Sequence, residues 1–140
     1  MEELELVPLC RVTMKVAETI VIDGTPNGTL MIGELIDSVW EGDRFRLRQR
    51  GRASADWMRR TDEGTAIPDI RLTLESDAGE LVLVQYTGRL DPDTGFAYTC
   101  PQFTTGAPGL AWLNRVQAVG RATFDPDTMT VHYPQIYALR

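Results

Sequence analysis

The segment IRLTLESDAGELVLV, residues 70–84, decides the fold class. Ile70, Leu72 and Leu74 alternate with polar residues, which is the period-two pattern of a half-buried β-strand. Asp77-Ala78-Gly79 is a turn signal, and the apolar run of residues 81–84 follows it. A strand, a short turn and a second strand form a β-hairpin, so this segment predicts an antiparallel sheet.

The same pattern of strands and turns extends to both ends of the chain. We predict strands over residues 4–16, 19–23, 29–36, 44–59, 70–75, 80–90, 96–103, 110–124 and 129–139. Gly51 is expected to kink the strand 44–59, and Pro101 to break the strand 96–103. A helical turn fits only around residues 108–112.

These strands and short turns predict one domain, residues 1–140. Its expected fold is all-β: an antiparallel up-and-down β-barrel of about eight strands with a central pocket. A β-sandwich of similar strand count is the alternative. A chain of this length can bury a sizeable core, so it needs no disulfide or metal for stability.

The acidic net charge of −6 disfavours nucleic acid as a partner, because such binding depends on Lys and Arg. The alternating arginines of residues 44–52 are a local exception. They fit the solvated face of a strand, a patch for an anionic ligand or partner, or a nucleic-acid contact.

Cys10 and Cys100 are far apart and have no metal-ligand spacing. The chain begins Met-Glu-Glu without a signal segment, and it has no apolar run long enough to span a membrane. We therefore expect a cytoplasmic protein with free thiols and no membrane partner, with a Cys10–Cys100 disulfide as the alternative.

Several polar and aromatic side chains are candidates for a pocket. Trp112 and Asn114 share a face of a predicted strand. They can form an aromatic wall beside an amide that hydrogen-bonds a ligand. The alternative is that Trp112 anchors the core and the Asn114 amide holds a loop in place. Asp56 precedes Trp57, and an indole beside a carboxylate can exclude water from it and raise its pKa. The alternative is that Asp56 lies on the surface while Trp57 lies in the core. In a regular strand only one of Asp56 and Trp57 faces inward, unless a bulge brings both in.

Four further residues complete the candidate set. Arg71 is the single cation in its alternating strand, and it can hold an anionic or carbonyl oxygen or pair with Asp56. Trp40 can wall the apolar part of a ligand, and Tyr98 is one of four tyrosines that supply phenols to the core or rim. His132, the only histidine, is a candidate base or a structural residue, and alone it cannot build a zinc site.

No nucleotide-binding glycine motif, phosphate loop, serine-hydrolase elbow or zinc-protease motif is present. We therefore expect no cofactor. The predicted function is a cofactor-independent enzyme acting on a small, partly apolar organic molecule by acid–base chemistry, of the isomerase, lyase or cyclase type. Asp56 would transfer the proton and Arg71 would hold the oxygen. The alternatives are a non-catalytic small-molecule-binding barrel and a structural protein with a packed interior.

Four segments of the chain carry a family resemblance: GRASADW at 51–57, DIRLTL at 69–74, DAGEL at 77–81 and AWLNR at 111–115. With them in order, the chain resembles the domain of unknown function 3237 family over nearly its whole length. The resemblance implies a small closed β-barrel, an oligomeric state, and site positions at Asp56, Trp57, Arg71, Trp112 and Asn114. The family's usual glycine-rich stretch after Gly28 is here MIGELID, residues 31–37.

Residues 81–84 are apolar on both faces of their strand. The outward residues of this run need a partner surface, so we expect a homodimer or a higher homo-oligomer.

Overall fold

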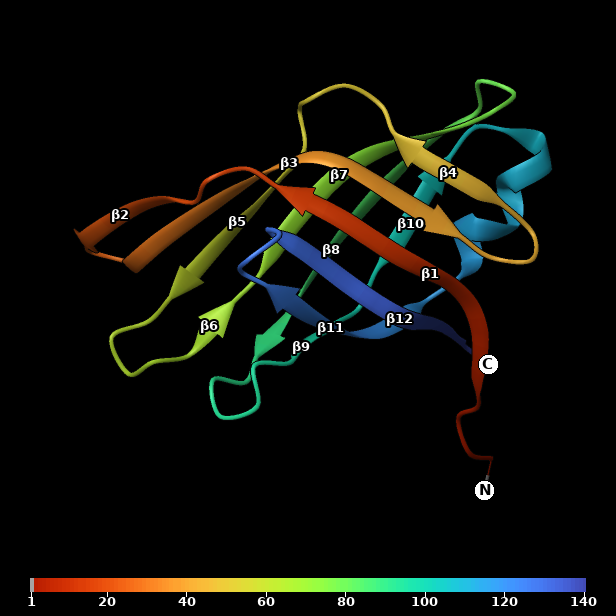
Figure 1. The fold of residues 1–140 in the computed structure, drawn as a ribbon. Helices are drawn as coiled ribbons and strands as arrows, with labels where there is room; N and C mark the ends of the chain where they lie inside the picture. Colours follow the sequence, from red (N-terminus) through yellow and green to blue (C-terminus); the bar gives the residue numbers. More distant parts are fainter. Residues whose placement is uncertain (1) are drawn as a thin grey trace.

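The computed structural model describes residues 2–140 as one twisted antiparallel sheet that closes on itself (Figure 1). Its elements are β1 (Leu6–Val16), β2 (Ile20–Thr25), β3 (Gly28–Glu41), β4 (Arg46–Gln49), β5 (Ala55–Arg60), β6 (Ala66–Ile67), β7 (Asp69–Ser76), β8 (Leu81–Leu90), β9 (Ala97–Thr99), β10 (Gln102–Thr105), the 3₁₀ helix η1 (Pro108–Arg115), β11 (Ala118–Asp125) and β12 (Thr130–Leu139).

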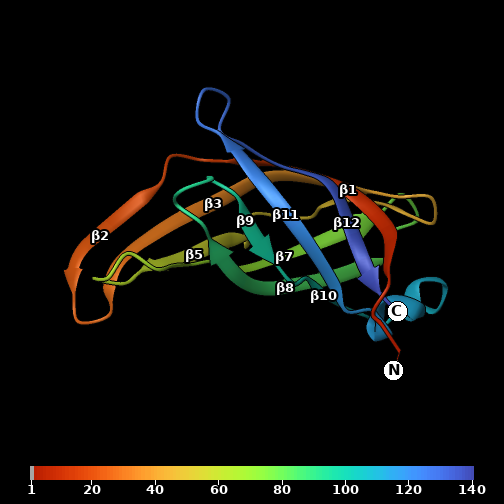
Figure 2. The same ribbon diagram turned by 90° about the horizontal axis from the view of Figure 1, so that it is seen from below.

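Ten strands form the barrel, in the order β1-β12-β11-β9-β8-β6-β5-β7-β4-β3, and β3 pairs back with β1. Two strands lie outside this ring: β2 extends β3 as a projecting hairpin, and β10 pairs with β8 (Figures 1 and 2). The all-β antiparallel barrel is confirmed, but the expected number of about eight strands is too low.

The difference arises where predicted strands are interrupted. Residues 44–59 become β4 and β5, because the chain leaves the sheet around Gly51, whose φ of 72° suits glycine. The chain breaks at Pro101 as expected, so β9 and β10 pair with successive parts of the long strand β8.

The predicted strand 110–124 is wrong in its first half, where η1 replaces it. Pro108 supplies a favourable first helical turn, and Leu110 and Leu113, one 3₁₀ turn apart, are both buried. Sequence alternation in this segment therefore reflects one apolar face of a short helix, and the strand begins only at Ala118.

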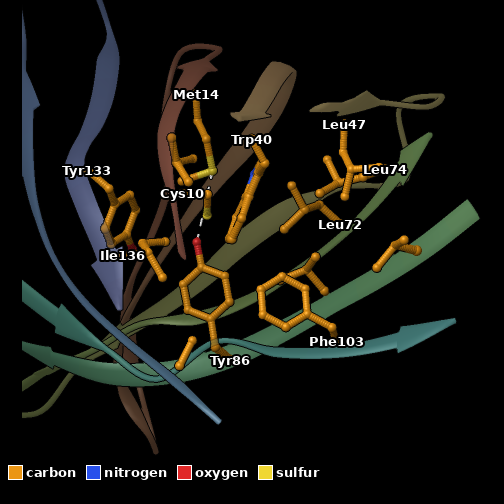
Figure 3. Packing of buried hydrophobic residues seen from close by; sticks show 14 of the residues in the cluster. Cys10, Met14, Trp40, Leu47, Leu72, Leu74, Tyr86, Phe103, Tyr133 and Ile136 are labelled. Atoms are coloured by element: carbon orange, nitrogen blue, oxygen red, sulfur yellow. Dashed lines mark hydrogen bonds between the residues drawn. The ribbon is translucent and has the colours of Figure 1, made fainter. Parts of the chain in front are cut away.

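The barrel interior near η1 is filled with side chains. Trp40 is fully buried and packs edge-on against Tyr86 and Phe103, and leucines of β4 and β7 lie on one side of it (Figure 3). The Trp40 indole Nε1 donates a hydrogen bond to Ser38 Oγ at 2.9 Å, so its one polar group is satisfied inside the core.

The arginines of residues 44–52 lie on the outer surface. Arg46, Arg48, Arg50 and Arg52 each pair with a carboxylate, for example Arg48 with Asp37 at 2.8 Å. The guanidinium of Arg44 instead lies 3.6 Å from the centre of the Trp112 ring. The row is therefore a charge-paired solvated face, the first of its three interpretations.

Candidate functional site

The end of the barrel away from η1 contains a pocket of about 250 Å³. Its wall is mostly apolar, and its polar side chains are Asp56, Tyr133 and three threonines. The lining residues are Met14, Val16, Thr19, Met31, Gly33, Leu35, Asp56, Met58, Pro68, Ile70, Leu90, Gly95, Ala97, Thr99, Ala122, Thr123, Phe124, Val131 and Tyr133. Among residues 2–140, Asp56 is thus the only charged side chain that lines the pocket.

The alternation of β5 points Asp56 into this pocket. β5 pairs with β3 without a register shift, so Asp56 and Met58 share the inner face and Trp57 faces outward. Trp57 is 44% exposed, so no bulge brings both members of the Asp56–Trp57 pair inside. The residue opposite Asp56 on β3 is Gly33, and Val16 packs over it, since a Cβ on Gly33 would lie 3.1 Å from Val16 Cγ1.

The carboxylate of Asp56 has one protein partner. Its Oδ1 accepts a hydrogen bond from the backbone N–H of Asp69 at 3.0 Å, and among residues 2–140 Oδ2 accepts none. Burial raises the pKa of Asp56 to about 6; the Asp69 amide opposes this rise and the Asp69 carboxylate adds to it. Asp56 therefore exchanges a proton near neutral pH and keeps one oxygen free for a ligand.

Two buried phenols lie beside this acid. Tyr133 shares a hydrogen bond of 2.9 Å with Thr99 Oγ1, and both residues line the pocket. The hydroxyl of Tyr86 points at the sulfur of Met14, 3.9 Å away (Figure 3). Burial raises the pKa of both phenols, and the Asp56 carboxylate raises each further, so both stay protonated at neutral pH.

Gly120 fixes the position of Tyr133. A Cβ on Gly120 would lie 2.9 Å from Cδ1 of the Tyr133 ring and 3.0 Å from Ile136 Cγ1. Only a residue without a side chain lets the phenol pack against β11 in this way. From the sequence, Tyr133 is grouped with the tyrosines of the core or rim. It lies two residues from Val131, another lining residue, and this alternation is the signal that could place Tyr133 in the pocket.

Arg71 lies outside the pocket, although we expected it to hold a ligand oxygen. It is exposed on the outer face of β7, opposite Ala55 and Gln85, because its neighbour Ile70 takes the inward position. It therefore cannot reach a molecule bound beside Asp56.

The other predicted site residues also lie away from the pocket. Trp40 is in the packed core, and Trp112 packs on η1 against Phe45, with ring centroids 6.1 Å apart. His132 is exposed on β12, with Nδ1 at 3.4 Å from Thr13 Oγ1, and Tyr98 is exposed on β9.

Asn114 ties down a loop, which was the second of its two interpretations. Its Oδ1 accepts from the backbone N–H of Thr105 at 2.8 Å, and its Nδ2 donates to Thr105 O at 2.9 Å. Both ends of the amide are thus used within the fold, far from Asp56.

Cys10 is buried and Cys100 is half-buried, and both are free thiols. Residues 2–140 hold no group of three or more His, Cys, Asp and Glu side chains placed to bind a metal ion. In the same residues, no helix has the length and apolar character needed to cross a membrane.

The fold and site define a class of protein: a small closed antiparallel β-barrel, packed at one end, with a single acid in an apolar pocket at the other. The chain belongs to the family described as a protein of unknown function (DUF3237), whose model matches residues 4–138. No curated protein matches it.

Solved structures share the fold over the whole chain. A β-barrel-like protein from Acinetobacter baumannii AYE has a TM-score of 0.87 at 25% identity, covering 100% of this chain and 98% of its own. A protein of unknown function from Clostridium acetobutylicum has a TM-score of 0.87 at 18% identity, covering 100% and 99%. An enzyme from Penicillium herquei has a TM-score of 0.74 at 18% identity, covering 99% and 94%.

Proposed function

We propose that the barrel pocket binds a small, mostly apolar organic molecule and catalyses an acid–base reaction on it without a cofactor, of the isomerase, lyase or cyclase type. The observation that carries this proposal is the Asp56 carboxyl, alone in an apolar pocket with a pKa near neutrality. Such a group is suited to proton transfer. The likeness in fold to the Penicillium herquei enzyme is compatible with it.

Asp56 would act as the base. Its free Oδ2 would take a proton from an acidic C–H or O–H of the substrate, while Oδ1 stays held by the Asp69 amide. The negative charge left on the substrate needs a hydrogen-bond donor, and Tyr133 would supply it in place of Arg71. When Thr99 donates to the Tyr133 oxygen, the phenol hydrogen is free to point at the ligand.

The pocket selects for an uncharged molecule. No Lys or Arg lines it, so a ligand carboxylate would meet the Asp56 charge without compensation. Its volume of about 250 Å³ lies just below the range of about 300–1,000 Å³ that suits drug-sized ligands. We therefore expect a compact molecule with a carbonyl or hydroxyl group.

The apolar wall with its three methionines equally suits a non-catalytic binding protein, which is the second candidate. A thermal-shift screen of uncharged metabolites, followed by product analysis on each hit, separates the two. If the protein is an enzyme, Asp56→Asn should lower turnover of the hit by at least about a hundredfold and leave the fold intact. Ligands that bind and never change would support the binding protein.

In the catalytic case, turnover should also rise with pH through about 6, as the Asp56 carboxyl loses its proton. Arg71→Gln is the matched control, because this exposed side chain lies outside the pocket. Full activity in folded Asp56→Asn would overturn the assignment of the base.

A further inference from the structure

A second hollow, of about 610 Å³, lies on the outer surface of the barrel over β9, β11 and β12. These strands are hydrogen-bonded neighbours and run side by side in Figure 2. The hollow is lined by aromatic rings, an arginine and small or polar residues: Phe96, Tyr98, Thr99, Cys100, Val119, Gly120, Arg121, Thr123, Pro134, Gln135 and Tyr137. We call it the outer groove. The proposed acid–base function does not use it.

Three side chains form a row across the outer groove and its edge. Tyr98 of β9 pairs with Arg121 of β11 on one side and with Arg89 of β8 on the other. The strands carrying the two arginines are two sheet spacings apart, about 10 Å. Two cations thus flank an exposed phenol ring.

In the part of the chain that the structure describes, the two arginines of this row, Arg89 and Arg121, have no carboxylate within ion-pair distance. Six other arginines of residues 2–140 form ion pairs within 4.0 Å, and neither Arg89 nor Arg121 is among them. Arg121 lies over the ring of Phe96 at 4.5 Å, which holds its guanidinium beside the groove. Arg89 donates only to the backbone oxygen of Gly88, at 2.7 Å.

The remaining wall is suited to a flat ring. Phe96 and Tyr98 contact each other edge-on at 6.4 Å, and Tyr137 and Pro134 contribute further apolar surface from β12. Guanidinium groups bind carboxylates and phosphates through paired hydrogen bonds, and aromatic rings stack on planar ligands. The barrel pocket also has aromatic rings, Phe124 and Tyr133, but none of the lining residues is a Lys or Arg that could bind an anion.

We propose that the outer groove is a second ligand site, which binds a planar aromatic anion between Tyr98 and Arg121 with Arg89 at its edge. The aromatic ring of the ligand would pack on Tyr98 and Phe96. The carboxylate of the ligand would accept hydrogen bonds from the guanidinium of Arg121. This site takes an anion and the barrel pocket takes a neutral molecule, so the two sites differ in ligand class.

Naphthoate is the probe, and its neutral analogue naphthamide is the ligand control. Titration of the full chain by calorimetry should give saturable binding of naphthoate and at least tenfold weaker binding of naphthamide, because the amide loses the charge-assisted hydrogen bonds to Arg121. In nuclear magnetic resonance spectra, naphthoate should shift the amide signals of β9 and β11, and leave those of β5 in place.

Arg121→Gln and Tyr98→Ala should each weaken naphthoate binding by about tenfold or more. Arg71→Gln removes an equally exposed strand arginine outside the groove and should not change the affinity. The proposal is overturned if naphthoate shows no saturable binding, if naphthamide binds equally well, if Arg71→Gln weakens binding as much as Arg121→Gln, or if the shifted signals belong to β3 and β5. Asp56→Asn should leave naphthoate binding intact, so failure of the acid–base proposal and failure of this one are distinguishable.

Discussion

At the scale of single residues, Asp56 places a titratable group where burial disfavours its charge. Its pKa of about 6 in the folded chain lies above the value of about 3.9 in an unfolded chain. Between these two pH values the folded state binds more protons than the unfolded state, so the free energy of unfolding falls as pH rises. Above pH 6 the ionised carboxylate destabilises the fold by up to about 3 kcal/mol.

We therefore predict that Asp56→Asn stabilises the protein at pH 7.5 by about 1–3 kcal/mol and has little effect at pH 4. The asparagine Oδ1 can still accept the hydrogen bond from the Asp69 amide. Urea unfolding at the two pH values measures this, with the exposed Asp62→Asn as control. An equal effect of Asp56→Asn at both pH values would contradict the assigned pKa.

Tyr133 is the second residue that the proposed chemistry needs. Tyr133→Phe removes the hydroxyl, keeps the ring against Gly120, and should lower turnover of an identified substrate about tenfold or more with little change in KM. Tyr137→Phe is the control, because Tyr137 lies on the same strand β12 and lines the outer groove, not the barrel pocket. Equal losses in the two variants would show that Tyr133 has no special role.

At the scale of elements, the packing of β11 against β12 sets the shape of the pocket. Gly120→Ala adds a Cβ that would lie 2.9 Å from Tyr133, so the ring must move and the fold should lose about 1–3 kcal/mol. Activity on an identified substrate should fall with it. Gly106→Ala, where a Cβ would meet nothing within 4 Å, is the matched control. Thermal unfolding and steady-state kinetics measure the two effects, and unchanged values in Gly120→Ala would refute them.

At the scale of the whole molecule, two exposed leucines at the start of β8 form an apolar patch on the outer surface. Leu81 and Leu83 are 48% and 37% exposed, whereas Val82 and Val84 are fully buried in the core. We continue to expect a homodimer or higher homo-oligomer that covers these leucines. Light scattering at micromolar concentration should give a mass at least twice that of one chain. The double variant Leu81→Arg, Leu83→Arg should have the mass of a single chain. A mass of one chain for the unaltered protein would contradict this prediction.

Local patterns in the sequence predict the all-β class, most turns and the inward position of residues such as Ile70 and Leu72, because strand alternation is a local property of the chain. The sequence also singles out Asp56, which the structure places in the wall of the barrel pocket. Which neighbours share the pocket depends on pairing between distant strands: Gly33 of β3 lies opposite Asp56 on β5, and Thr99 of β9 reaches Tyr133 of β12. Arg71 lies outside the pocket because the alternation that places Ile70 and Leu72 inward turns Arg71 outward, and Asn114 lies outside it because η1 replaces the predicted strand. Only closure of the barrel decides which of the inward residues meet inside it.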